Sequence, residues 1–182
     1  MLRRLLVAGL AMLILTGCGA AQEAPAAKAA ASKSAAAEKA AADRAAAAEK
    51  QRAERTAIYK ECTKIITPFD DALSGLNSRL SVGLPFADYS KQVGNVSVAH
   101  DKVIKKAKAL GGVSDQCVNR VATPLEDALR AYVKAYNVWN ACISDTYCTF
   151  DGDKLKQAQG SWSKASTLID KAETALAKLR PA

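Results

Sequence analysis

Apolar residues recur at alternating intervals of three and four in four stretches of the chain after Arg55. Such spacing places the apolar side chains on one face of a helix, because an α-helix makes one turn in 3.6 residues. No comparable run alternates with the period of two that marks a half-buried strand. The pattern predicts four amphipathic helices, and their apolar positions are Ile58, Cys62, Ile65, Phe69, Ala72, Leu76 and Leu80; Val93, Val96, Ala99, Val103, Ala107 and Leu110; Val121, Leu125, Ala128, Tyr132, Ala135, Trp139 and Cys142; and Leu155, Ala158, Trp162, Ala165, Ile169, Ala172, Leu176 and Leu179.

Turn-forming residues separate the four predicted helices. Gly83 and Pro85 follow the first helix, Gly111-Gly112 follows the second, and the segment 145–153 joins the third to the fourth. Short connections favour antiparallel neighbours. We therefore predict an all-α domain over residues 58–180, folded as an antiparallel four-helix bundle.

The two halves of this region begin alike. Cys62 is followed by Thr67-Pro68-Phe69-Asp70-Asp71, and Cys117 is followed by Thr123-Pro124-Leu125-Glu126-Asp127. The order Thr, Pro and then acidic residues is typical of the start of a helix. A Thr side chain can cap the free backbone N–H groups there, Pro fits the first turn, and carboxylates favour the positive end of the helix dipole. The echo predicts two related helical hairpins, with a kink or a restart of the helix at each proline.

The chain begins with a short positive stretch and a short apolar run. Arg3 and Arg4 precede residues 5–15, which are almost wholly apolar but too few to span a bilayer comfortably. The run ends in Leu15-Thr16-Gly17-Cys18. Here the sequence resembles the bacterial lipoprotein family, whose lipobox is Leu, a small residue, Gly or Ala, and then Cys. The resemblance covers about the first 20 residues.

The resemblance implies that residues 1–17 are a lipoprotein signal peptide. Cleavage before Cys18 would follow attachment of a diacylglyceryl group to the Cys18 sulfur, and the new amino terminus would be acylated. Two or three acyl chains give stable anchoring where one is marginal. The expected location is the membrane surface outside the cytoplasm, at the cell surface or the periplasmic face, with membrane lipid as the first partner.

Two segments of low complexity follow Cys18. Residues 18–33 hold Ala, Gln, Glu, Pro, Lys and Ser with nothing to bury, which predicts a disordered tether. Residues 34–57 are Ala interspersed with charge, and Ala has the highest helix propensity. Because no large apolar residue lies between Leu15 and Ile58, we expect an exposed helix that extends the first helix of the bundle, either as a spacer or as a fraying segment.

The five cysteines divide into Cys18 and an even set of four. Outside the cytoplasm an even set indicates two disulfides, and the absence of a Cys-x-x-Cys pair argues against zinc. In an up-down-up-down bundle Cys62 and Cys117 lie at one end, and Cys142 and Cys148 lie at the other. The predicted pairs are therefore Cys62–Cys117 and Cys142–Cys148, because the alternatives join opposite ends.

The net charge of the chain indicates which classes of binding partner it suits. The chain carries a net charge of +8. A mild basic excess suits anionic lipid or an anionic cell-wall polymer, or simply solvated helix faces. Nucleic acid is a poor partner for an exported protein. The predicted contact surface combines a basic cluster with two aromatic side chains off the apolar stripes, namely Lys102, Lys105, Lys106, Lys108, Tyr136 and Tyr147.

The sequence gives little support for a catalytic site or a metal site. His100 is the only histidine and has no nucleophile in a recognisable frame, so we expect a partly buried or surface histidine. Asp145, Asp151 and Asp153 lack the spacing of an EF-hand, and Asp151 or Asp153 is expected to cap the last helix. We predict no catalytic residues, no metal and no cofactor.

These observations predict a lipid-anchored envelope protein with a non-enzymatic role. The first hypothesis is a structural module or one that binds an envelope protein or a glycan. The alternative is a ligand-binding or sensor domain that holds a small molecule between its helices.

Overall fold

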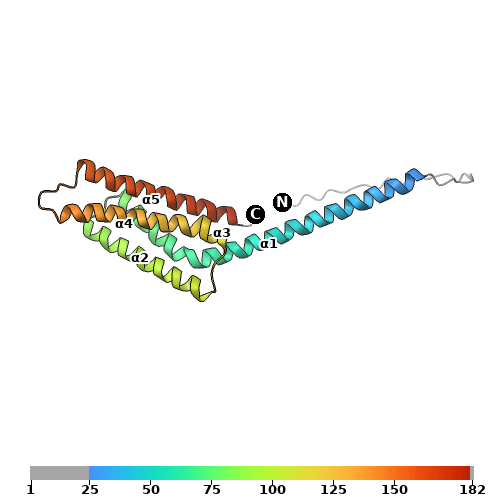
Figure 1. The fold of residues 1–182 in the computed structure, drawn as a ribbon, viewed down its shortest axis with the longest axis horizontal. Coiled ribbons are helices and arrows are strands. Elements are labelled where there is room, and N and C mark those ends of the chain that lie inside the picture. The colour runs from blue at the N-terminus through green and yellow to red at the C-terminus, as the bar shows by residue number, and fades with distance from the viewer. Residues whose placement is uncertain (1–24, 181–182) are drawn as a thin grey trace, which may run out of the picture. The chain divides into compact units, whose positions relative to one another are not determined.

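The computed structural model describes residues 25–180, in which helix is the regular secondary structure and no strand occurs (Figure 1). Four long helices account for most of this described part: α1 (Pro25–Ser81), α2 (Phe86–Ala109), α4 (Thr123–Ile143) and α5 (Gly152–Leu179). Between α2 and α4 lie the short helix α3 (Asp115–Cys117) and the π-helical turn η1 (Val118–Ala122). Among the described helices, none is both long and apolar enough to span a bilayer.

The chain divides into two units, residues 1–45 and residues 46–182. In the first unit the described residues are helical from Pro25, and the side chains of residues 36–45 are exposed. The helix thus begins inside the segment 18–33 that the sequence predicted as a tether, because Ala favours helix and Pro is accepted in a first turn. The predicted signal peptide and Cys18 lie outside the described residues.

The second unit contains the core. The apolar stripes of the four predicted helices supply most of its buried side chains, among them Ile65, Phe69, Leu76, Val96 and Leu125. Leu110 departs from the prediction, since 52% of it is exposed. It follows the last residue of α2, where Gly111 (φ 78°) and Gly112 (φ 117°) end the helix in a conformation that favours glycine.

The two Thr-Pro pairs behave differently. Pro68 lies inside α1, and the Thr67 hydroxyl donates to the Thr63 carbonyl instead of capping a new helix (2.7 Å). The predicted restart at Pro68 is therefore wrong. Pro124 lies in the first turn of α4, but the residues before it in η1 are also helical, and the N-cap residue of α4 is Ala122 and not the predicted Thr123. Packing of the apolar stripe keeps α1 helical where the local sequence alone favours a break.

A chain of hydrogen bonds crosses the core between the four long helices. The Trp162 indole donates to the Tyr89 hydroxyl (3.0 Å), which donates to the Tyr132 carbonyl (2.7 Å). The Tyr132 hydroxyl donates to Asn77 (3.0 Å), whose amide donates to Ser166 (3.3 Å). Tyr89 and Tyr132 are fully buried, so these bonds satisfy polar groups that would otherwise be costly.

Both predicted disulfides are present. Cys62 in α1 is bonded to Cys117 in α3 across a sequence separation of 55 residues, and Cys142 in α4 is bonded to Cys148 in the following loop across 6. Disulfides of this kind are typical of proteins that fold in an oxidising compartment outside the cytoplasm.

Candidate functional site: a basic groove beside α5

The aromatic part of the predicted contact surface separates into two kinds of side chain. Tyr136 is half-buried and stacks on Phe86, with ring centroids 5.5 Å apart, and Trp139 packs on the same Phe86 ring. Tyr136 therefore belongs to the aromatic packing of α2 and α4 and is not a free contact residue. Tyr147 is 96% exposed in the disulfide loop and keeps its predicted availability.

The predicted basic cluster on α2 is exposed at all four positions, Lys102, Lys105, Lys106 and Lys108. Lys106 is engaged, because its ammonium donates to the Lys64 carbonyl of α1 (2.6 Å). The other three lysines stand on a helix face and do not line any of the cavities described below.

A larger concentration of positive charge follows the line between α5 and its neighbours α4 and η1. One depression of about 570 Å³ lies between α4 and α5, and a second of about 480 Å³ lies between η1 and α5. We call the two together the basic groove. Its cationic residues are Arg120, Arg130, Lys134, Lys156, Lys164, Lys171 and Lys178.

The spacing of the α5 lysines explains why they share the groove. Lys156, Lys164, Lys171 and Lys178 are separated by eight, seven and seven residues, close to two helical turns each. At about 100° per residue they fall within a sector of about 80°. Gly160 lies in the middle of this sector, and a methyl group added there would meet no other atom within 4 Å. The surface is therefore open at Gly160, and the four lysines span about 33 Å along α5.

The charges in the groove are unequally neutralised. Arg130 pairs with Asp127 (2.6 Å) and approaches Glu126 (4.0 Å), so its charge is largely balanced. The groove also contains Asp170. Within the described chain no ion pair involves its five lysines, all of which are exposed. The groove thus presents several free ammonium groups in a row.

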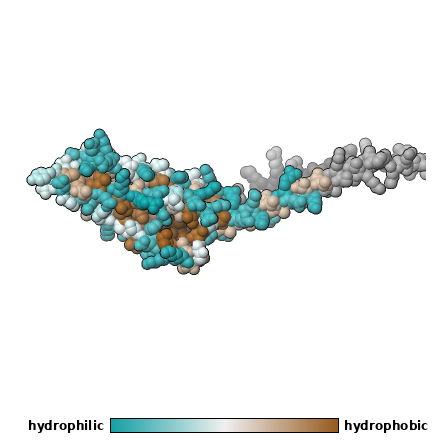
Figure 2. Space-filling view, viewed as in Figure 1, coloured by the Kyte–Doolittle hydropathy of each residue, from teal (hydrophilic) through white to brown (hydrophobic). Residues whose placement is uncertain are grey.

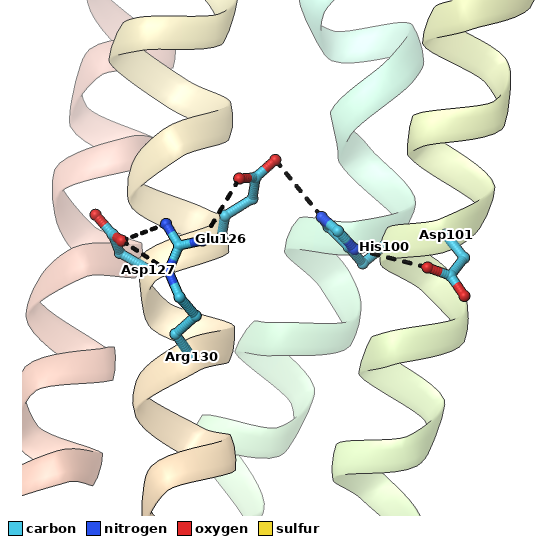
Figure 3. A network of polar contacts seen from close by, with 5 residues as sticks. All are labelled: His100, Asp101, Glu126, Asp127 and Arg130. Atoms are coloured by element: carbon cyan, nitrogen blue, oxygen red, sulfur yellow. Dashed lines mark hydrogen bonds and ion pairs between the residues drawn. The ribbon is translucent and has the colours of Figure 1, made fainter.

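Figure 3 shows how Arg130 belongs to a wider polar network. The Glu126 carboxylate lies between Arg130 and His100, whose Nε2 is 3.5 Å from Glu126 Oε1, and His100 Nδ1 lies 3.8 Å from Asp101. The network connects α4 with α2. His100 is partly buried, with 26% of its side chain exposed.

Among the carboxyl groups of the described residues, Asp70 is the one whose pKa is strongly shifted. Burial, together with the nearby charges of Glu173 and Asp71, raises the pKa of Asp70 from 3.8 to about 6. Its Oδ1 atom is buried without a hydrogen-bond partner. The sequence had assigned Asp70 to a helix first turn, and that assignment fails because α1 continues through Pro68.

The acidic loop between α4 and α5 is held by its own hydrogen bonds. Asp145 accepts a hydrogen bond from the Tyr147 amide (3.0 Å), and Asp151 accepts one from the Thr149 hydroxyl (2.9 Å). Asp151 occupies the N-cap position of α5 without a side-chain bond to the helix. Among residues 25–180 no group of three or more potential ligands is arranged to hold a metal ion.

No protein-family model, curated protein or solved structure matches the chain. The site is therefore interpreted from its own chemistry.

Sequence reasoning missed the basic groove. Lys134 and Lys156 are 22 residues apart but line the same depression, and such proximity cannot be read from a local cluster. One signal was available. The lysines of α5 recur every seven or eight residues, which predicts a continuous basic face on one helix.

Proposed function

We propose that this protein is an exported, lipid-anchored module that binds a phosphate-bearing anionic polymer of the cell envelope through the basic groove, without catalysing a reaction. The observation that carries the proposal is the row of lysines along α5, which have no ion-pair partner within the described chain. An extended polymer can contact several of them at once.

The chemistry of the groove favours an extended anion over a compact one. Exposed ammonium groups each bind a phosphate weakly, and binding becomes strong only when many contacts form on one chain and release its counterions. Small floor residues, Gly160 and Ser161 among them, leave the backbone of a polymer room to approach α5.

The anchoring part of the proposal rests on the lipobox Leu15-Thr16-Gly17-Cys18. Lipidation of Cys18 would place the protein at the membrane, where envelope polymers are concentrated. The two disulfides support export, because they form in oxidising compartments.

We further propose that residues 58–180 form an antiparallel bundle of two helical hairpins. Contacts between helices run in opposite sequence directions, as Arg55 bonds to Lys178 whereas Asn77 bonds to Ser166. Residues 36–55 are exposed and rich in alanine, which supports a role for this helical segment as a spacer.

Binding to long-chain inorganic polyphosphate tests the proposed function. The mature chain with Cys18→Ser carries no acyl group, and fluorescence anisotropy of labelled polyphosphate reports its affinity. The triple variant Lys156→Gln, Lys164→Gln, Lys171→Gln should bind about a hundredfold more weakly, at about 1 kcal/mol for each lysine lost.

A matched control keeps the net charge of that variant. Substitution of Lys102, Lys105 and Lys108 by Gln removes three charges from exposed positions on α2, away from the groove. This control should keep its affinity within about threefold, because these distant charges are screened at physiological salt. Equal losses in the two variants would show that net charge and not the groove binds the polymer.

Location is tested separately. Cys18→Ser in the full chain should move the protein from the membrane fraction to the soluble exported fraction, with both disulfides and the far-UV circular dichroism unchanged. Retention of the variant in the membrane fraction would contradict lipid anchoring.

A further inference from the structure

A small apolar pocket lies beside His100, and none of its lining residues lines the basic groove. It has a volume of about 120 Å³ and is lined by residues of α1, α2, α3, η1 and α4. Its lining is almost wholly apolar and includes Ile65, Phe69, Val103, Val113, Cys117 and Val118. The two polar side chains at the pocket, His100 and Glu126, come from α2 and α4.

The pocket has a buried floor and an accessible edge. Ile65 and Phe69 are each about 1% exposed, whereas Val118 is 40% exposed and so reaches solvent. Figure 2 shows apolar side chains gathered on the visible face near the C-terminal end of α2. An apolar opening of this kind favours entry of an apolar group.

The backbone beside the pocket is irregular. Val118 and Ala122, the first and last residues of the π-helical turn η1, both line it. A π-turn inserts an extra residue into a helix, and such turns are frequent at functional sites. Cys117 immediately before the turn is fixed to α1 by the disulfide to Cys62, so the wall of the pocket is held in place.

His100 has an unmet hydrogen bond at this pocket. Its Nε2 atom is buried and has no hydrogen-bond partner, because Glu126 Oε1 is 3.5 Å away without the geometry of a bond. The ring packs against Phe69, with centroids 5.1 Å apart. A buried polar atom without a partner is unfavourable, and a ligand that supplies one gains from satisfying it.

We propose that this pocket binds a single aromatic ring that carries a hydroxyl group, that is, a phenol. The pocket, at about 120 Å³, is somewhat smaller than the cavity of about 150 Å³ that holds one benzene molecule, so a single ring is the largest group that it can take. A hydroxyl group both donates and accepts. It can accept from His100 Nε2–H while it donates to Glu126, or it can donate to an unprotonated Nε2 instead.

Charge at the pocket selects against anionic rings. Glu126 lines it, and Asp101 faces His100 from the other side, whereas Arg130 is shared between Glu126 and Asp127. A benzoate ion would bring a third carboxylate to this edge. Binding of phenol but not of benzoate is therefore the signature of the site.

The single histidine provides the assay. Because His100 is the only histidine of the chain, its imidazole gives one isolated set of proton resonances in the mature Cys18→Ser chain. Titration with phenol should shift these resonances saturably. Toluene should bind about tenfold more weakly, as it lacks one hydrogen bond, and benzoate should not bind.

A pair of substitutions tests the location. Val118→Trp should fill the opening and abolish the phenol shift, whereas Val98→Trp is the matched control, because Val98 is 53% exposed on α2 and does not line the pocket. Far-UV circular dichroism checks that both variants fold. The comparison of phenol, toluene and benzoate on the unsubstituted domain does not depend on either variant.

The source of the ring is tested with N-acetyltyrosinamide. A shift like that of phenol would assign the pocket to a tyrosine side chain of a partner protein, and a shift with phenol alone would assign it to a small free phenol. No saturable shift with either compound, or an equal shift with benzoate, would overturn the proposal. Neither result depends on binding of polyphosphate to the basic groove.

Discussion

Removal of one buried hydroxyl should measure how far the core hydrogen bonds hold the helices together. Tyr89 is fully buried, and its hydroxyl donates to the Tyr132 carbonyl (2.7 Å) and accepts from the Trp162 indole (3.0 Å). In Tyr89→Phe the ring packing stays, but two hydrogen bonds are lost and the indole N–H has no partner. At about 1 kcal/mol for each net bond, the free energy of unfolding should fall by about 2 kcal/mol.

The assay is urea unfolding of the oxidised mature Cys18→Ser chain, followed by far-UV circular dichroism and by tryptophan fluorescence. The midpoint should fall with an unchanged slope, and the melting temperature should drop by roughly 6 °C. Tyr147→Phe is the matched control, because the Tyr147 side chain is 96% exposed, and its change should stay within about 0.5 kcal/mol. Equal effects of the two substitutions would refute the role assigned to the buried network.

Two further predictions concern covalent bonds and pH. In chemical denaturation, replacement of the Cys62–Cys117 pair by serine should lower the free energy of unfolding by about 4 kcal/mol, and replacement of the Cys142–Cys148 pair by about 2 kcal/mol. The costs differ because the first disulfide closes a loop of 55 residues and the second a loop of 6. Equal costs would contradict the dependence on loop length. The pKa of Asp70 is raised in the folded state to about 6 from 3.8, so ionised Asp70 destabilises the fold above pH 6 and not below pH 3.8. Asp70→Asn should therefore raise the melting temperature at pH 7, and this gain in melting temperature should disappear as the pH falls toward 3.8. Asp43→Asn, at an exposed position, is the control and should show no such trend. A gain that persists at low pH would contradict the destabilising role of ionised Asp70.

The apolar stripes predicted the helices and most of the core because burial on one face leaves a period that the sequence displays. Ile65, Phe69 and Leu125 stand at stripe positions and are buried. Tyr136 was assigned to the surface because it lies off its stripe. It is half-buried because α4 packs against both α2 and α5, which makes its buried face wider than one stripe.

The Thr-Pro pairs show the limit of local signals. Pro68 lies within α1, and Pro124, although in the first turn of α4, follows helical backbone in η1. Neither Thr-Pro pair therefore interrupts the helical backbone. A capping motif indicates a helix start only where packing does not already hold the preceding residues in a helix.

The basic groove could be predicted only in part. The repeat of lysines along α5 is visible in the sequence, whereas the contribution of Lys134 and Arg120 depends on how α4 and η1 pack beside α5. The contact surface was predicted at the denser cluster Lys102–Lys108 because its residues are neighbours in sequence. The structure favours a surface assembled from separate helices over that local cluster.

The salt dependence of polyphosphate binding tests the central claim most directly. If lysines of the groove neutralise phosphates, the logarithm of the association constant should fall linearly with the logarithm of salt concentration. The triple substitution at Lys156, Lys164 and Lys171 should lower the magnitude of that slope by about 2 to 3, at roughly 0.7–0.9 for each lost contact, whereas the α2 control should leave it unchanged. An unchanged slope in the groove variant would contradict the account.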